Sequence, residues 1–310
     1  MIDCMETNGR KIDSAAFVLK PSSLIMANLD KVSSRIKKLN TNDFINKELY
    51  LPSTHLFGNP GKLLRSAFIF ATAGMLGERQ GDFIDLAASI ELLHTASLVH
   101  DDIIDRDSMR RGVQAVHAKF GVDSAILAGD ALIAKAIQLA APYGEEVINA
   151  ISRAAMNMCA GEMLDYSYQA AKEIPNVTTY LRIAKHKSAA LIATSMSIID
   201  IYKKGRSNAL LYKAGESLGM AFQIRDDIMN FMGIEDLSKK TVNSDAARFR
   251  PNIVSTVGKH LSLDKASAVK RSININNSLV SECTALLTKV KDSDEIVKYA
   301  NTIKIPQVSK

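Results

Sequence analysis

Two acidic clusters, each following an apolar stretch, are the first candidates for chemistry. HDDIID contains Asp101, Asp102 and Asp105, and QIRDDIMN contains Asp226 and Asp227. On a helix, Asp101 and Asp105 lie one turn apart on one face, with Asp102 beside them. Carboxylates this close repel each other, so a cation is expected among them. Clustered oxygen ligands suit Mg²⁺, which usually bridges carboxylates to phosphates.

A solvated helix end is the alternative reading of either cluster alone. The run from Phe83 to Asp105 argues against it, because the run is apolar around most of its circumference and predicts a helix buried in a bundle. Two acidic clusters that each end such a helix indicate carboxylates facing one another across a cavity of the bundle. The pair is therefore more informative than either motif alone.

Basic residues at several points of the chain could bind phosphate. Arginine forks hold phosphate oxygens through two hydrogen bonds, and lysine supplies a point charge. Arg110 and Arg111 directly follow the first acidic cluster, which indicates a shared site for an anion and a metal. For the other basic candidates a solvated surface charge is the alternative; they are Lys62, Arg65, Lys187 and Lys240.

Helical periodicity dominates the chain, and period-two strand patterns are almost absent. The predicted helices cover residues 14–39, 61–77, 83–105, 123–141, 145–172, 177–203, 206–232 and 263–304. The polar stretch 233–251 is expected to be a surface loop. We expect an all-α fold, a single large helical bundle with a central cavity, forming one domain over residues 1–310.

Composition narrows the class of protein. The net charge of +6 is too small for a dedicated nucleic-acid binder, and 47% hydrophobic residues exclude disorder. Cys4, Cys159 and Cys283 are far apart, so neither a disulfide framework nor a zinc cluster is expected. No uninterrupted apolar run reaches the ~18 residues of a membrane span, and the best candidate, 189–199, is interpreted as a buried helix.

Both ends of the chain give further expectations. The N-terminal MIDCMETNGRKID contains acids and lacks an apolar core, so it resembles neither a secretory signal nor a transit peptide, and a cytoplasmic location is expected. The basic C-terminal KYANTIKIPQVSK is expected to be a solvated tail, with peripheral contact to anionic lipid as the alternative.

Six segments together resemble the trans-isoprenyl diphosphate synthases. HTASLVHDDIIDRDSMRRG and GMAFQIRDDIMNFMG resemble the two aspartate-rich regions of that family. GNPGKLLRSA, AGEMLD, HKSAALI and SKKTVNSD resemble its GGKRxRP, GQxLD, GKTAxL and GKPxGSD segments. They occur in the family's order from about residue 58 to 254, about two thirds of the chain. The resemblance implies an isoprenoid synthase-like bundle and Mg²⁺-dependent condensation of isopentenyl diphosphate with an allylic diphosphate (dimethylallyl, geranyl or farnesyl).

The resemblance also assigns roles to individual residues. Asp101, Asp105 and Asp226 would ligate Mg²⁺, three ions with diphosphate bound, with Asp102 in support and Asp227 acting mainly through its neighbours. The positions that hold the allylic diphosphate are Arg110, Lys187 and Lys240. Those that hold isopentenyl diphosphate are Lys62, Arg65, His94 and Arg111. Those that line the place where the allylic cation forms are Gln223, Lys187 and Ser188.

Several residues depart from the family pattern or have a second reading. His94 lies two turns before Asp101, and a satisfied core histidine is the alternative to diphosphate binding. Asn230 replaces the last aspartate of the second motif. GNPGKLLRSA has Leu63 and Ser66 where arginine and proline are frequent. Arg250 offers a charge where the family has lysine, and Arg248 has no explanation.

Product length is expected to depend on the helix before Asp101. Side chains four, five, eight and eleven residues back are expected to face the growing chain; they are Ser97, Ala96, Leu93 and Ile90. Farnesyl-producing relatives commonly have a bulky aromatic at one of the first two positions, and both are small here. We therefore expect a product of twenty carbons, geranylgeranyl diphosphate, or longer.

Three other classes of protein share part of this pattern. A class I terpene cyclase would need an acid at residue 234, which is isoleucine. A catalytically silent partner subunit would be marked by loss of the first aspartate motif, which is intact, although Asn230 leaves this reading open. A head-to-head condensing enzyme would show DxxED-type motifs, which are missing. By family resemblance a homodimer is expected, with residues 123–141 as the interface and simple core helix as the alternative.

Overall fold

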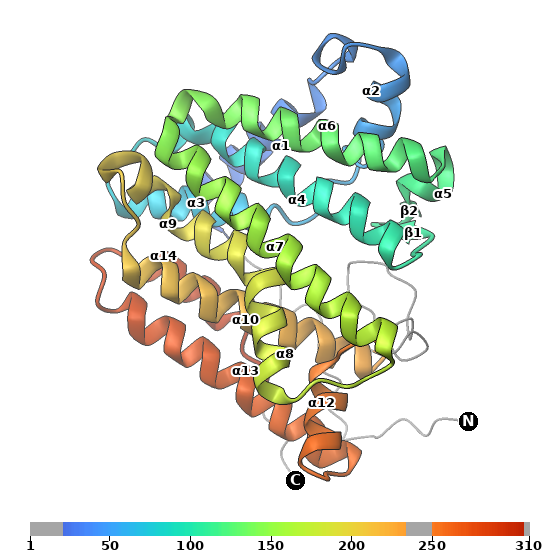
Figure 1. Cartoon of the computed structure of the whole chain (residues 1–310). Helices are drawn as coiled ribbons and strands as arrows, with labels where there is room; N and C mark the ends of the chain where they lie inside the picture. The colour runs from blue at the N-terminus through green and yellow to red at the C-terminus, as the bar shows by residue number, and fades with distance from the viewer. Residues whose placement is uncertain (1–20, 234–249, 307–310) are drawn as a thin grey trace.

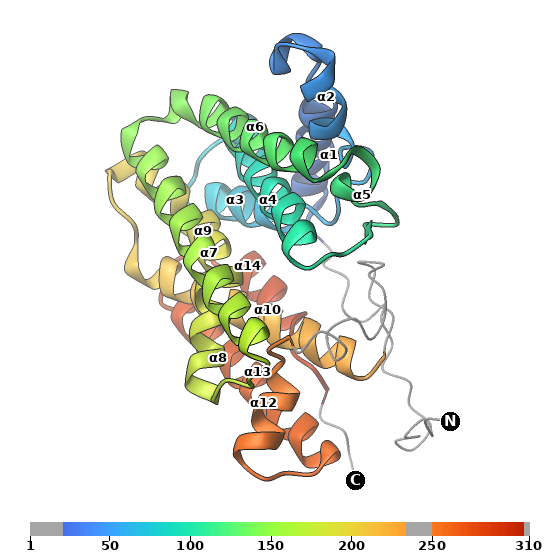
Figure 2. The ribbon, with the colours of Figure 1, turned by 45° about the vertical axis from the view of Figure 1, so that its right-hand side comes forward.

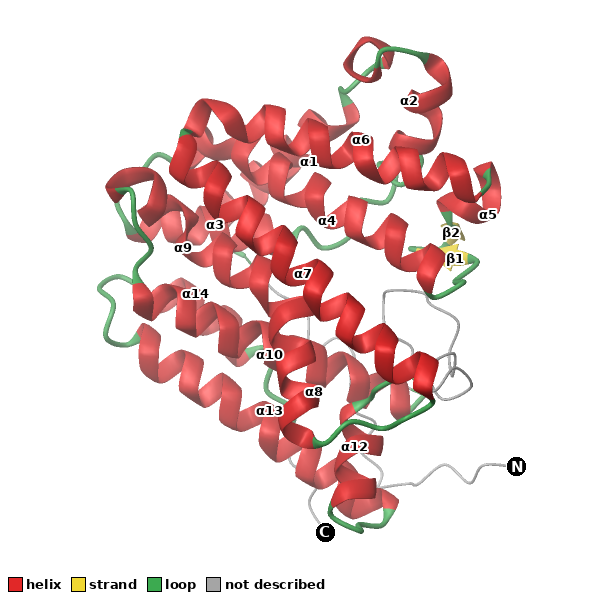
Figure 3. Ribbon diagram, in the orientation of Figure 1, coloured by secondary structure: helices red, strands yellow, loops and turns green. Residues whose placement is uncertain are grey.

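The computed structural model describes residues 21–233 and 250–306, and nearly all of their regular structure is helical (Figures 1 and 3). The α-helices are α1 Ser23–Lys37, α2 Lys47–Thr54, α3 Leu64–Met75, α4 Ile84–Ile104, α5 Val116–Phe120, α6 Val122–Ala140, α7 Glu145–Ala171, α8 Val177–Ala184, α9 Ala190–Lys204, α10 Ala209–Phe231, α12 Ile253–His260, α13 Lys265–Leu287 and α14 Asp294–Asn301. Short 3₁₀ turns cover Thr41–Phe44, Gln80–Phe83 and Ala141–Tyr143, and a π-helical turn covers Lys185–Ala189. The predicted all-α bundle is confirmed.

The sequence pattern located the long helices and missed the short ones. The predicted 263–304 helix is two helices, α13 and α14, and the predicted 177–203 helix is interrupted by the π-helical turn. The two-residue strands β1 Met109–Arg110 and β2 Val113–Gln114 form an antiparallel hairpin that is too short to show a period-two pattern. The expected surface loop 233–251 and the start of the 14–39 helix fall mostly outside the described residues.

The core lies between helices that pack along much of their lengths. α4 packs along α6, while α10 packs between α9 and α13. Every residue of α9 from Ala190 to Ile201 is buried, which confirms the predicted buried helix. Its Thr194 and Ser195 hydroxyls donate to the carbonyls four residues earlier, so these polar groups are satisfied inside the core.

The end of the described chain is docked against α13, and it is not a solvated tail. Ile303 and Ile305 are each 1% exposed. The Asn277 side chain donates to the Ile305 carbonyl at 2.8 Å and accepts from the Ile305 amide at 2.9 Å. The expectation of a solvated tail is therefore wrong up to residue 306, because alternating isoleucines supply apolar area that the basic composition conceals.

Among the described residues, one helix is long and apolar enough to cross a membrane by length and composition, in the segment Val122–Tyr143. This is weak support for a span, because the core helix of a soluble protein passes the same test.

α4 and α10 carry the two acidic clusters near their C-terminal ends. Both helices run in the same direction and end on the right-hand side of the bundle in Figure 1, and the rotated view of Figure 2 agrees. The fold therefore places the ends of both predicted motifs on one side of the molecule.

Candidate active site

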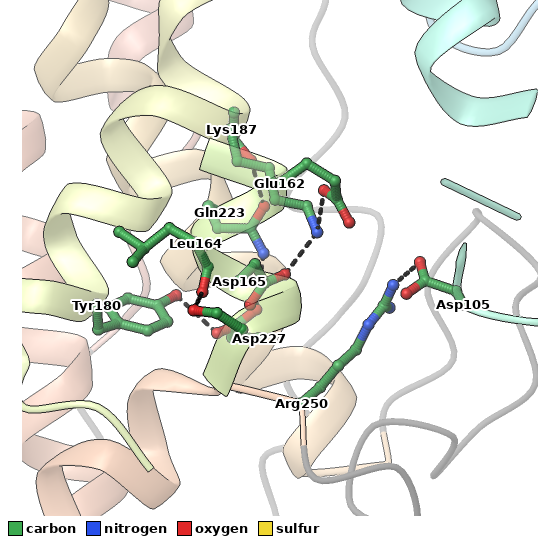
Figure 4. Close-up of polar contacts among 11 residues, drawn as sticks. Asp105, Glu162, Leu164, Asp165, Tyr180, Lys187, Gln223, Asp227 and Arg250 are labelled. Carbon is green, nitrogen blue, oxygen red and sulfur yellow. Dashed lines mark hydrogen bonds and ion pairs between the residues drawn. The ribbon is translucent and has the colours of Figure 1, made fainter. Parts of the chain in front are cut away.

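The three aspartates of the first cluster have different surroundings at the end of α4. Asp101 is half-buried, and within the described residues its carboxylate makes no hydrogen bond or ion pair. Asp102 is fully buried and accepts a hydrogen bond from Arg110 Nε at 2.8 Å. Asp105 follows the last helical residue and is paired with Arg250, which comes after α10 (Figure 4). The expected cation substitute at residue 250 therefore reaches this cluster.

A tight hairpin positions Arg110 and Arg111. Arg110 ends β1, and the turn to β2 is made by Arg111 and Gly112, both with positive φ (51° and 82°). Positive φ at both central residues defines the two-residue hairpin turn that matches strand twist. A non-glycine residue in this region stores strain, as is common where a side chain is held for function. Arg110 is 4% exposed and lies between Asp102 and Asp107, so its charge is already neutralised.

Arg65, His94 and Arg111, together with Glu91, form what we call the arginine cluster. Arg65 lies in the first turn of α3, and burial lowers its pKa to about 10 against the opposing effect of Glu91. Burial also lowers the pKa of Arg111, again opposed by Glu91. His94 is held neutral at pH 7, because burial and then the Arg65 and Arg111 charges lower its pKa well below its usual value.

Polar atoms in the arginine cluster are incompletely satisfied. Buried Glu91 accepts hydrogen bonds from the Ser66 amide at 3.0 Å and the Ser66 hydroxyl at 2.9 Å. The Nε atom of Arg65 is buried without a hydrogen-bond partner in the described part of the chain. A buried donor without a partner costs free energy, so an anion bound here would regain it. Lys62 lies in the loop that precedes α3, and its side chain is exposed.

The second acidic cluster divides between the surface and the interior. Asp226 has a 40% exposed side chain and contacts Arg225 at 3.2 Å. Asp227 is buried and accepts from Tyr180 Oη at 2.6 Å and from Gln223 Nε2 at 2.8 Å. The Asp227 carboxylate therefore contacts neighbouring side chains, and its expected role in the reaction stays a prediction.

Lys187, Glu162 and Asp165 form what we call the lysine–carboxylate cluster (Figure 4). Lys187 Nζ lies 2.6 Å from a carboxylate oxygen of each acid. Burial alone would lower the pKa of Lys187, but Asp165, Glu162 and Asp101 outweigh it and raise the pKa, so the ammonium is protonated. Burial raises the pKa of Glu162 to about 6, which Lys187 opposes.

The π-helical turn explains how Lys187 reaches this position. It holds Lys187 and Ser188, and π turns of one extra residue are frequent at functional sites. α7 passes so close that a Cβ on Gly161 would lie 2.3 Å from the Lys187 amide nitrogen. Only glycine fits there, and its neighbour Glu162 is thereby brought beside Lys187.

Of the α4 side chains expected to face the growing product, Ala96 points elsewhere. Ser97 and Leu93 lie four and eight residues before Asp101 and share its face. Ala96 lies four residues before His100, whose ring contacts α6 at Gly129. Ser89, seven residues before Ala96, donates to the Ala136 carbonyl of α6. Ala96 therefore faces α6, and Ile90 is fully buried.

The structure thus groups most of the predicted site residues, although not all of them are described. The first aspartate cluster and the hairpin arginines lie at the C-terminal end of α4, and the charges of Arg65 and Arg111 act on His94 in the middle of that helix. Ser188, Gln223 and Asp227 form a chain of hydrogen bonds between the π turn and α10, whereas Lys187 contacts Glu162 and Asp165 of α7. Lys240 and Arg248 lie outside the described residues. Within residues 21–233 and 250–306, no three His, Cys, Asp or Glu side chains converge well enough to hold a metal alone.

Four site residues were missed from the sequence: Glu91, Glu162, Asp165 and Tyr180. Glu162 and Asp165 lie in the AGEMLD segment, so the resemblance of this segment to the family's GQxLD element was the signal for both residues. Glu91 and Tyr180 lie in apolar helical runs, where one polar residue gives no pattern of its own. The sequence signal for Glu91 was its acidic side chain within a strongly apolar helical run, because charged residues are rarely buried without a partner.

Comparison with known proteins identifies the family of this chain. The family model described as polyprenyl synthetase matches residues 46–290. A short chain isoprenyl diphosphate synthase of Methanothermobacter thermautotrophicus is 31% identical over 273 residues, 86% of this chain and 83% of the relative. A geranylgeranyl diphosphate synthase of Sulfolobus acidocaldarius is 34% identical over 267 residues, 83% and 77% of the two chains.

A solved structure shows the same fold. The geranylgeranyl pyrophosphate synthetase of Geoglobus acetivorans superimposes with a TM-score of 0.81 at 24% identity, covering 92% of this chain and all of that one. The fold and the arrangement of acids and cations define a prenyl-transferring isoprenoid synthase. The chain belongs to the polyprenyl synthetase family and is a trans-isoprenyl diphosphate synthase. The resemblance found in the sequence is confirmed.

Proposed function

We propose that this enzyme condenses isopentenyl diphosphate with an allylic diphosphate to an all-trans product of twenty carbons or more. The carrying observation is that the first aspartate cluster acts electrostatically on both other clusters, through Asp102 on Arg111 of the arginine cluster and through Asp101 on Lys187 of the lysine–carboxylate cluster. Relatives named geranylgeranyl and geranylfarnesyl diphosphate synthases support the product class. The arginine cluster would hold isopentenyl diphosphate, and Lys187 would hold the allylic diphosphate.

The acidic residues fit Mg²⁺ bound together with diphosphate. Mg²⁺ takes one or two carboxylates, several waters and substrate phosphate oxygens, so it needs no cage of three protein side chains. Asp101, Asp105 and Asp226 would hold the ions, and we expect three per site. Bound Mg²⁺ would stabilise the negative charge that develops on the leaving diphosphate.

The protein's own groups account for the remaining steps. Lys187 attracts the leaving diphosphate as the allylic C–O bond breaks and its electron pair departs with the oxygen. The oxygens of Gln223 and Ser188 face the resulting cation. The double bond of isopentenyl diphosphate then forms the new C–C bond, and the proton lost from its C2 goes to the released diphosphate. No protein nucleophile is required.

Product length follows from the small side chains near Asp101. Ser97 leaves room on the cavity face of α4, and Leu93 is the first sizeable side chain one turn deeper. Because Ala96 packs toward α6, the α4 wall offers no aromatic floor. Geranylgeranyl diphosphate is the proposed product, with a longer polyprenyl diphosphate as the alternative.

The test is an assay of purified protein with Mg²⁺, labelled isopentenyl diphosphate and each allylic primer, with products resolved by chain length. Products of twenty carbons or more, lost in Asp101→Ala and kept in the matched surface control Asp30→Ala, support the proposal. Products of fifteen carbons alone would overturn the chain-length argument. A folded protein that incorporates no label with any primer would favour the non-catalytic subunit.

A homodimer through α6 is the proposed assembly. Four large apolar residues of this helix are 43–59% exposed: Val122, Ile126, Leu127 and Ile137. Met156 and Met163 of α7 are also exposed. Several exposed apolar side chains on one helix are typical of an interface, and the family resemblance makes a second copy the expected partner. Light scattering should give a dimer mass for the protein and a monomer for Leu127→Glu; a monomeric parent would refute it.

A further inference from the structure

The buried carboxylate of Asp227 joins three separate elements. Its Oδ2 accepts from the Tyr180 hydroxyl of α8 at 2.6 Å and from the Ile253 amide at the start of α12 at 3.0 Å. Its Oδ1 accepts from the side-chain amide of Gln223, one turn earlier on α10, at 2.8 Å. Figure 4 shows Tyr180 and Gln223 approaching Asp227 from different sides.

These contacts fix which way the Gln223 amide points. An ionised carboxylate only accepts hydrogen bonds, so the NH₂ group of Gln223 must face Asp227. The amide oxygen is then on the other side, where the Ser188 hydroxyl donates to it at 2.6 Å. Ser188 follows Lys187 in the π-helical turn, and the family resemblance implies that these two residues and Gln223 line the place where the allylic cation forms.

We propose that Tyr180 is a positioning residue that acts through Asp227 to keep the oxygen of Gln223, and not its NH₂ group, directed at the allylic cation. The proposal rests on the proposed function, because it requires a cationic intermediate. An amide oxygen stabilises a nearby positive charge, whereas the NH₂ end of the same dipole opposes it. The two orientations of an amide have nearly the same shape, so packing alone discriminates poorly between them.

Tyr180 is suited to this role by its own surroundings. The side chain is 2% exposed, and burial followed by the Asp227 charge raises its pKa well above the usual value. The hydroxyl therefore stays protonated and remains a donor. Without it, Asp227 loses the donor that reaches its Oδ2 from α8, so the carboxylate is held less firmly opposite Gln223.

The first experiment compares Tyr180→Phe with a matched control. Tyr299→Phe removes an equivalent bond, since Tyr299 is also 2% exposed and donates to Glu295 at 2.7 Å, far from the site. Both variants should lose roughly 2–4 °C in Tm. Only Tyr180→Phe should lower kcat, by about tenfold, with KM for both diphosphates within twofold of the parent. It should also increase the share of primer captured by water as allylic alcohol.

The second experiment is a double-mutant cycle with Gln223→Leu. If Tyr180 acts through Gln223, adding Tyr180→Phe to Gln223→Leu should change kcat by less than about twofold. Full additivity, or equal kcat losses in Tyr180→Phe and Tyr299→Phe, would overturn the positioning role. A parent protein that makes no prenyl product would instead refute the proposed function, so the two failures are distinguishable.

Discussion

The arginine cluster and the lysine–carboxylate cluster are neutralised to opposite extents. In the first, burial lowers the pKa of Arg65, and the opposing charge of Glu91 does not outweigh it. In the second, one ammonium lies between two carboxylates and its pKa is raised. One cluster therefore has surplus positive charge, and the other has surplus negative charge.

This difference distinguishes how each diphosphate would be bound. Surplus positive charge suits an anion that arrives without metal. Surplus negative charge suits an anion that arrives with cations, because the carboxylates and the diphosphate would otherwise repel each other. Under the proposed function, this charge balance would separate the substrate that Mg²⁺ activates from the substrate that is only held.

The largest effect is expected from Lys187→Met, which tests the charge balance of the lysine–carboxylate cluster. It removes the cation between Glu162 and Asp165 and leaves a half-buried and a buried carboxylate without their shared counter-charge. We expect a loss of kcat of about 10²-fold or more and of about 3 kcal/mol in the free energy of unfolding. Steady-state kinetics and urea unfolding measure both. Exposed Lys31→Met is the control, and a variant with unchanged kcat would remove Lys187 from the site.

Glu91→Gln tests whether Glu91 balances the positive charge of the arginine cluster. The new amide side chain can still accept from Ser66, but the counter-charge of Arg65 and Arg111 is lost, at a cost of about 1–3 kcal/mol in stability. Added pyrophosphate supplies negative charge without metal, so it should raise the Tm of the variant more than that of the parent. Equal Tm shifts in thermal melts with pyrophosphate would show that Glu91 does not balance these arginines.

Glu162→Gln tests the other side through pH. The folded-state pKa of Glu162 is raised to about 6, so its contribution to stability is present below about pH 4.5 and is lost as the pH rises through 6. The glutamine variant lacks this loss. Its stability relative to the parent should therefore increase by about 1–2 kcal/mol between pH 4.5 and 6.5. Urea unfolding at both pH values measures it; a constant difference contradicts the raised pKa.

The smallest expected effect comes from Ser66→Pro, which introduces the residue that is frequent in the family. Proline removes both donors to Glu91, although it is compatible with the first turn of a helix. Loss of both hydrogen bonds should cost about 1–2 kcal/mol, and Ser66→Ala, which keeps the amide, about half of that. Equal losses in both variants, measured by urea unfolding, would assign the effect to the hydroxyl alone.

Much of this fold was predictable because its long helices are strongly periodic. α4, α6, α7 and α10 were placed within a few residues, and the two acidic clusters were correctly expected to end buried helices. The short helices α2 and α5 were missed, since a few residues cannot show a helical period. The hairpin was missed for the same reason, because its two-residue strands show no period and its turn is marked in the sequence by Gly112 alone among residues 109–114.

The site was less predictable than the fold because partners depend on tertiary packing. Sequence spacing could place Asp101 and Asp105 on one face, but it could not show that Arg250 pairs with Asp105. Nor could it show that Ala96 turns toward α6, since a helical face is defined only relative to a neighbour. Glu91 and Tyr180 gain their roles solely from what packs against them.

The π-helical turn at Lys185–Ala189 and Gly161 constrain the length of the chain as well as its composition. A π turn holds one residue more than an α turn, so deleting a single residue there would regularise the helix and rotate everything before it by about 100° relative to α9. Such a deletion would make the helix more regular and the enzyme inactive. Activity therefore depends on the number of residues at this point, although the helix itself would tolerate a deletion.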